Sequence, residues 1–194
     1  MNKYFLPYCL LLMLAFCSTS VTAQRLAVKT NLLYDATLTP NIGAELGIGK
    51  KSTVQVVYGF NPWEFSDGKQ FKHWQLMPEY RWWPCSKFNG HFFGVHAMGG
   101  QFNVAKIDAT LPFYGWPSDL DETRYEGWNV GGGFTYGYQW ILGKHWNFEA
   151  SVGVGYDYIK YKQYPCEDCG SLIREGHKNY FGFTKAVLSI LYIF

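Results

Sequence analysis

Apolar and polar residues alternate with a period of two along most of the chain. Side chains of a β-strand point to its two faces in turn, so this pattern predicts strands with one apolar and one polar face. Eight segments carry the alternation: 26–36, 41–49, 53–61, 73–82, 91–104, 128–142, 146–158 and 185–194. The sequence therefore predicts an all-β protein with eight strands.

One of these segments changes parity. In 91–104, Phe93 and Val95 place the apolar face on odd positions, whereas Phe102 and Val104 place it on even positions. A β-bulge adds one residue to a strand and exchanges the two faces. We therefore expect a bulge at Gly99-Gly100.

The connections between the segments alternate in length. Short turns are expected at 49–52, 84–89 and 143–145, and long connections at 62–71, 106–123 and 163–178. In bacterial outer-membrane barrels the short turns face the periplasm and the long loops face outward. The pattern predicts an eight-stranded antiparallel up-and-down transmembrane β-barrel with short periplasmic turns and longer extracellular loops. Tryptophans near the expected strand ends would form its aromatic girdles: Trp63, Trp74, Trp82, Trp83, Trp128, Trp140 and Trp146.

Composition helps to choose between this barrel and a soluble, lipocalin-like one. The chain is 48% hydrophobic and 20% aromatic, but only 16% of its residues are charged. A soluble barrel would turn its apolar face inward and needs a charged exterior. The polar faces are rich in Gly, Asn, Ser and Thr instead, which favours an apolar face toward lipid. The net charge of +2 lacks the basic excess of a nucleic-acid-binding protein.

The first 23 residues have the features of a cleaved signal peptide. Lys3 precedes an apolar run at 4–16, and cleavage is expected between Ala23 and Gln24. A lipoprotein signal ending at Cys17 is the alternative, but bulky Phe16 disfavours it. Residues 24–194 would then form one barrel domain in the outer membrane of a Gram-negative bacterium, among outer-membrane lipids. A last strand that ends in Phe194 suits recognition by the barrel-insertion machinery.

Several ionisable residues fall on the face expected to line the lumen. Buried charges are costly unless they are paired, so we expect a salt-bridged network that fills a narrow lumen rather than a catalytic site or proton path. An eight-stranded barrel filled in this way has no wide channel. The expected network contains Lys29, Asp35, Glu45, Glu79, Arg81, Glu149, Asp157 and Lys185, with His73 nearby.

The cysteines add a smaller prediction. Cys166 and Cys169 lie in the last long connection, where a local disulfide is expected in an oxidising compartment. A metal site that includes His177 is the alternative, although it would be one ligand short of a closed zinc site. Cys85 is expected at the opposite end of the barrel, unpaired. No cofactor or metal is predicted.

Short motifs also point to a family. The chain resembles domain-of-unknown-function family 3575 in the segments 29–35 (KTNLLYD), 61–63 (NPW), 78–81 (PEYR), 89–94 (NGHFFG), 137–140 (GYQW) and 185–186 (KA). The resemblance implies an exported small outer-membrane β-barrel of the Bacteroides lineage. It supplies no catalytic residue. Some relatives accompany surface-fimbria systems, which hints at a role in assembly or adhesion.

The leading functional hypothesis is a structural or surface-interaction protein whose long loops meet an extracellular protein or glycan. Phe113, Tyr114 and Trp116 form an aromatic cluster suited to such a surface, or to packing on the barrel rim. One alternative is a lipid-modifying enzyme of the outer membrane. Its candidate groups would be His73, His91, His96, His177 and Ser171. The other alternative is a soluble periplasmic ligand-binding barrel.

Overall fold

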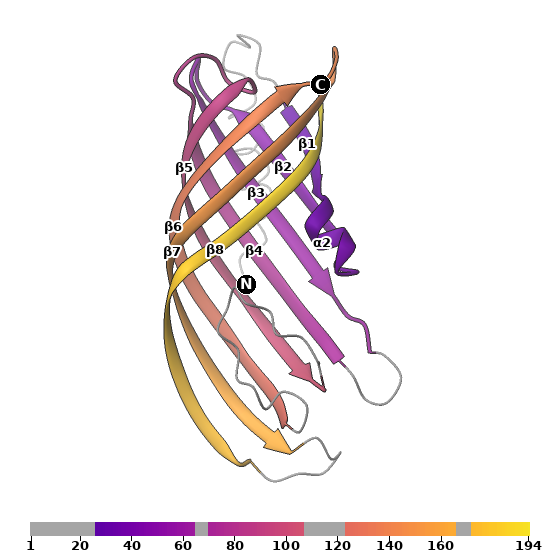
Figure 1. The fold of residues 1–194 in the computed structure, drawn as a ribbon, viewed down its shortest axis with the longest axis vertical. Helices are drawn as coiled ribbons and strands as arrows, with labels where there is room; N and C mark the ends of the chain where they lie inside the picture. The colour runs from indigo at the N-terminus through magenta and orange to yellow at the C-terminus, as the bar shows by residue number, and fades with distance from the viewer. Residues whose placement is uncertain (1–25, 65–69, 107–122, 166–171) are drawn as a thin grey trace, which may run out of the picture.

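The computed structural model describes residues 26–64, 70–106, 123–165 and 172–194. Each strand pairs antiparallel with the next, and the last pairs back with the first, so the sheet is a closed barrel (Figure 1). The predicted all-β fold with eight up-and-down strands is confirmed. The elements are β1 (Leu26–Asn31), α2 (Leu32–Ala36), β2 (Asn41–Gly47), β3 (Ser52–Asn61), β4 (Gln70–Trp82), β5 (Gly90–Ala105), β6 (Thr123–Ile141), β7 (Trp146–Pro165) and β8 (Arg174–Ile193).

The connections follow the predicted alternation. Residues 48–51, 83–89 and 142–145 form tight links at one end, which we call the short-turn end. β3, β5 and β7 end at the other end of the barrel, which we call the long-loop end. The connection predicted at 163–178 is shorter than expected, because 163–165 belong to β7 and 174–178 to β8.

The first predicted strand is wrong beyond Asn31, because the chain turns there into the short helix α2. The side chain of Asn31 accepts a hydrogen bond from the backbone N–H of Leu33 at 3.2 Å, which caps the helix. The backbone N–H of Asn31 in turn donates to Asn41 Oδ1 at 2.7 Å, so the turn is tied to the start of β2. In the described ranges no helix is both long and apolar enough to cross a membrane.

The predicted bulge at Gly99-Gly100 is also wrong. β5 pairs with β6 without interruption from Gly90 to Ala105, so Phe102 and Val104 simply face the inside of the barrel. The register shift lies between β7 and β8 instead. There Gly153 pairs with Lys185 and Val154 with Phe183, which leaves Thr184 as an extra residue between them.

The wall of the barrel is much taller on one side than on the other. Strand length grows from 6 residues in β1 to 20 in β8, so the long-loop end slopes steeply in Figure 1. β1 pairs with β8 only from Ala27 opposite Ile193 to Asn31 opposite Ser189. Beyond Asn31, helix α2 lies against β8 in place of a strand.

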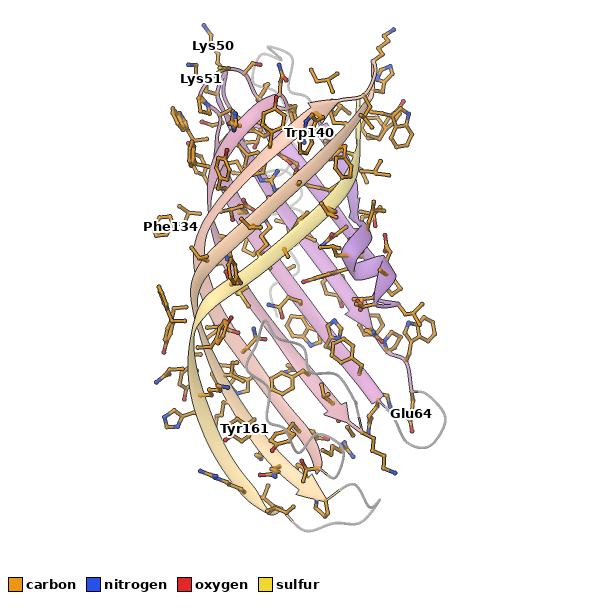
Figure 2. The ribbon with its side chains drawn as sticks, in the orientation of Figure 1. Lys50, Lys51, Glu64, Phe134, Trp140 and Tyr161 are labelled. Atoms are coloured by element: carbon orange, nitrogen blue, oxygen red, sulfur yellow. The ribbon has the colours of Figure 1, made fainter. Side chains whose placement is uncertain are left out.

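The two faces of the sheet differ sharply in character. Large apolar side chains project outward, as Phe134 does in Figure 2 with 72% of its surface exposed. Trp83 is an exception to the girdle predicted from the sequence, because it is fully buried inside the short-turn end. Seven charged side chains, in contrast, are buried inside the barrel: Lys29, Glu45, Glu79, Arg81, Glu149, Asp157 and Lys185. This distribution is the reverse of that in ordinary soluble proteins.

Candidate functional site

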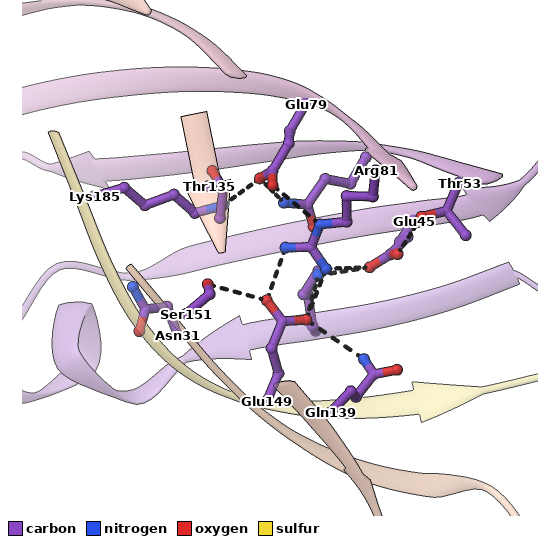
Figure 3. Close-up of polar contacts among 12 residues, drawn as sticks. Asn31, Glu45, Thr53, Glu79, Arg81, Thr135, Gln139, Glu149, Ser151 and Lys185 are labelled. Carbon is purple, nitrogen blue, oxygen red and sulfur yellow. Dashed lines mark hydrogen bonds and ion pairs between the residues drawn. The ribbon is translucent and has the colours of Figure 1, made fainter. Parts of the chain in front are cut away.

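A cluster of buried charged residues lies inside the barrel (Figure 3). Its charges balance, because it holds three basic side chains and three carboxylates. These side chains come from five strands: β1, β2, β4, β7 and β8. All of its members were predicted from their inward parity, and all are buried. The cluster consists of Lys29, Glu45, Glu79, Arg81, Glu149 and Lys185.

Arg81 lies at the centre of this charged cluster. Its Nη2 and Nη1 atoms lie 2.7 and 2.8 Å from the two carboxylate oxygens of Glu149, a bidentate pair. Nη1 also lies 3.0 Å from Glu45 Oε2, and Nε lies 3.3 Å from Glu79 Oε1. The guanidinium carbon sits 4.2 Å from the centre of the Phe92 ring, a favourable position for a cation. Arg81 therefore links all three carboxylates.

The two lysines complete the pairing. Lys29 Nζ lies 2.7 Å from Glu45 Oε2 and 3.1 Å from Glu149 Oε2, while Lys185 pairs with Glu79. Four neutral side chains that the sequence analysis did not single out also donate to the carboxylates. They are Thr53, at 2.7 Å from Glu45, Gln55, at 2.6 Å from Glu79, and Gln139 and Ser151, at 3.4 and 3.5 Å from Glu149. Their position on the inward face of the predicted strands could have identified them from the sequence.

Two residues predicted for this cluster lie elsewhere. Asp35 is exposed on α2, where it accepts hydrogen bonds from Thr30 Oγ1 at 2.8 Å and Asn41 Nδ2 at 2.9 Å. It left the inner face because the strand ends at Asn31. Asp157 does face inward and is buried, but its partner is Asn129 Nδ2 at 3.1 Å, nearer the long-loop end.

Aromatic side chains fill the barrel between the charged cluster and the short-turn end. The rings of Trp83 and Phe92 lie 4.8 Å apart, and those of Trp83 and Phe88 6.1 Å apart. The indole N–H of Trp83 donates to Thr53 Oγ1 at 3.0 Å, so this layer is joined to the cluster. Charged cluster and aromatic layer together occupy the lumen on this side.

On the long-loop side of the cluster the lumen opens into a cavity of about 700 Å³. Four residues of the charged cluster line this cavity and form its floor: Lys29, Arg81, Glu149 and Lys185. Most of the remaining lining is apolar, which was not expected for a barrel interior. Its apolar side chains include Val57, Met77, Phe102, Val104, Tyr125 and Tyr161.

The histidines considered as catalytic candidates occupy different surroundings. His96 is buried, with its ring nitrogens 2.9 Å from Thr135 Oγ1 and 2.9 Å from Thr184 Oγ1. His73 lines the cavity. His91 is exposed beside the hydroxyl of Tyr136, and His177 is exposed on β8. Among the residues with described positions, no three His, Cys, Asp or Glu side chains form a metal site.

Two exposed ion pairs lie near the long-loop end. Lys72 Nζ is 2.5 Å from Glu64 Oε2, and Lys160 Nζ is 2.9 Å from Glu175 Oε1. The hydrogen bond and positive charge of each lysine lower the pKa of its partner carboxyl. Exposed pairs of this kind contribute little to stability.

Some predicted site residues fall outside the described part of the chain. These are the cleavage-site residues Ala23 and Gln24, the cysteine pair Cys166 and Cys169, the enzyme candidate Ser171, and the aromatic cluster Phe113, Tyr114 and Trp116. The predictions made for them stay predictions. Cys85, which is described, is exposed and carries a free thiol.

Fold and site define a class of small all-β proteins, in which a closed ring of antiparallel strands surrounds a buried charged cluster and a cavity. The family model described as "Protein of unknown function (DUF3575)" matches residues 9–194, and the chain belongs to this family. This agrees with the resemblance inferred from the short motifs. No curated protein and no solved structure matches the chain.

Proposed function

We propose that this protein is an outer-membrane β-barrel of a Gram-negative bacterium with a structural or surface-interaction role and no catalytic activity. Its long loops would meet a protein or glycan outside the cell. The observation that carries the proposal is the inverted distribution of side chains, apolar outside and charged inside.

The outer face would be unstable in water. Outward side chains of neighbouring strands form a broad apolar surface, and soluble monomers rarely expose apolar patches beyond a few hundred Å². In a bilayer the same surface is favourable, and a closed sheet leaves no strand edge unpaired in the hydrocarbon. The outward apolar side chains include Val54, Val56, Tyr58, Phe93, Val95, Phe134, Tyr136, Val152, Val154 and Tyr156.

Aromatic residues near the short-turn end support the same orientation. Trp82, Trp140 and Trp146 are exposed close to the ends of β4, β6 and β7. Tryptophan is enriched where a membrane meets water, because its ring is apolar and its N–H is polar. These residues would mark the periplasmic interface.

The filled lumen favours a scaffold over a diffusion pore. The charged cluster and the aromatic layer block the short-turn half, so a water-filled path through the barrel has no room there. Loops on a rigid frame are common binding elements. The long connections therefore carry the proposed interactions, with outer-membrane lipids around the barrel.

Membrane placement can be tested by substituting one outward residue. Phe134→Lys, near the middle of β6, should destabilise a membrane-inserted barrel by about 2–4 kcal/mol, whereas Leu142→Lys at the short-turn end should cost about 0–1 kcal/mol. The measurement is the fraction of heat-modifiable, folded protein in the outer-membrane fraction. If both variants stay folded in the soluble periplasmic fraction, the proposal is wrong.

The surface role can be tested by replacing residues 107–122 with a short Gly-Ser linker. We expect the barrel to fold, because its strands do not include this segment. Cross-linking on intact cells should yield adducts with surface proteins or glycans for the natural chain, and these should be lost in the variant. The control is a variant in which residues 65–69 are replaced with a Gly-Ser linker of the same length as the one used in the first variant. Unchanged adducts in the first variant would contradict a role for this loop.

A further inference from the structure

The cavity on the long-loop side has an apolar wall. Val104 and Tyr125 are buried, and Phe71, Phe102 and Tyr161 pack against them. These side chains come from β4, β5, β6 and β7, so one continuous surface extends across four strands. A chamber lined in this way is suited to hydrocarbon.

Three uncharged residues that line this cavity each carry a buried polar atom without a hydrogen-bond partner among the described residues. These atoms are Gln55 Oε1, Gln75 Nε2 and Ser189 Oγ. Gln55 and Ser189 are 2% and 1% exposed. Buried polar groups are nearly always satisfied in folded proteins, so three such atoms around one cavity indicate a missing partner. Both donors and acceptors are offered, and all three groups are uncharged.

The charged cluster at the floor of the cavity offers no excess charge, and Asp157, a further buried carboxylate in the lining, accepts hydrogen bonds from Asn129 Nδ2. Lys29, Arg81 and Lys185 are matched by three carboxylates within hydrogen-bond distance. A ligand with a phosphate or carboxylate group would therefore have to be desolvated without a free counter-charge. An uncharged polar group, such as a hydroxyl or an amide, meets no such cost.

The cavity reaches the outer surface of the barrel at one side. Leu33 of α2 and Phe183 of β8 both line it and are 38% and 53% exposed. They lie beyond Asn31, where β1 stops pairing with β8 and α2 takes the place of a strand. At this side the wall is closed by packing of α2 against β8 and not by a ladder of strand hydrogen bonds, so a side opening toward the surroundings of the barrel would form where these two elements meet.

We propose that this cavity binds one molecule of an uncharged amphiphile. Its hydrocarbon body would lie against Phe102, Val104 and Tyr125, and its hydroxyl or amide would bond to Gln55, Gln75 or Ser189. The volume of about 700 Å³ is within the range of ligand sites. Access from lipid through the side opening rests on the membrane placement proposed above, whereas the binding itself does not.

Photolabelling can test the site directly. The probe is dodecanol with a diazirine on its chain, added to the full-length protein in detergent, and labelled residues are mapped by mass spectrometry. We expect saturable labelling of the inward Met77 and Phe102, reduced about tenfold by excess plain dodecanol. The outward Leu76 and Phe93 should be labelled without saturation. Labelling confined to outward residues would mean a water-filled chamber and overturn the proposal.

A pair of neighbouring substitutions supplies the matched control. Val57→Trp fills the cavity and should lower labelling of Met77 about tenfold. Val56→Trp adds the same ring on the outer face and should leave it unchanged. Heat-modifiable mobility shows whether each variant folds. If Val57→Trp does not fold, competition by plain dodecanol in the natural protein still tests whether the cavity binds the probe. Equal labelling in both folded variants would overturn the proposal.

Two further comparisons address the polar group and the source of the ligand. The natural protein should prefer the dodecanol probe to dodecyl phosphate and to dodecane with the same diazirine, and Gln75→Leu should lower the preference over dodecane about fivefold. Stronger labelling by dodecyl phosphate would overturn the uncharged ligand class. In bilayers, a double-chain lipid with a diazirine on one acyl chain should label Phe102. If only the free dodecanol probe labels Phe102, the proposed access from lipid is wrong, and the ligand enters from the surrounding solution.

Discussion

Replacing Arg81 with methionine will destabilise the folded barrel by about 3–5 kcal/mol. The substitution removes the group that bonds to Glu149 through two nitrogens and also contacts Glu45 and Glu79. Three carboxylates would then share two lysines inside a lumen that water cannot readily enter. The measurement is urea unfolding of the protein in lipid vesicles, followed by tryptophan fluorescence.

Two controls separate this effect from simple loss of a side chain. Arg124→Met removes a half-buried arginine that pairs with Glu126 outside the charged cluster, and it should change the free energy of unfolding by less than about 1 kcal/mol. Glu149→Gln combined with Arg81→Met should be less destabilising than the sum of the single changes, because one unpaired charge is gone. Strictly additive effects, or an Arg81→Met variant as stable as the natural chain, would refute the structural role of the cluster.

Gly133→Leu will prevent the barrel from closing or destabilise it by about 3 kcal/mol or more. Gly133 pairs directly with Gly155 across β6 and β7. A Cβ atom at Gly133 would lie 2.2 Å from the carbonyl oxygen of Val154 and 2.7 Å from the Cα atom of Gly155. Both are backbone atoms, so no side-chain rotation can relieve the overlap and the two strands would have to separate.

The matched control is Gly143→Ala in the turn between β6 and β7. A Cβ atom there has no other atom within 4 Å, so folding yield and stability should be unchanged. Both variants are compared by the heat-modifiable fraction after refolding into detergent. A Gly133→Leu protein that refolds as well as the control would show that the two strands are not packed this closely.

Strand alternation in the sequence was sufficient to predict a ring of eight strands. It was not sufficient to predict which inward residues pair or where the first strand ends. Parity identified the charged cluster because a residue such as Glu149 or Arg81 alternates with large apolar neighbours. It could not identify partners, since contacts between β4 and β7 depend on barrel curvature and register. It also missed α2, where the single side chain of Asn31 caps a helix and outweighs the alternation that continues to Ala36.

The false bulge in β5 has a different cause. The alternation was interpreted as if the lumen were polar along its whole length, so inward apolar residues such as Phe102 and Val104 suggested exchanged faces. Around the charged cluster the lumen is polar, but toward the long-loop end polar residues such as Gln75 and Asn129 share the lining with large apolar ones. The same assumption shortened the sequence-based limits of β6, β7 and β8, whose distal parts bring Tyr125 and Tyr161 to the apolar cavity wall.

The unequal strand lengths imply an order of assembly. Neighbouring strands from β4 to β8 are joined by long ladders whose partners are close in sequence, and such local pairing forms early. Closure of the ring depends on the short ladder from Ala27 opposite Ile193 to Asn31 opposite Ser189. Its partners are separated by nearly the whole chain, so it has the largest loop-closure entropy to overcome. We expect the seam between β1 and β8 to be the last ladder to form during insertion and the first to open during unfolding.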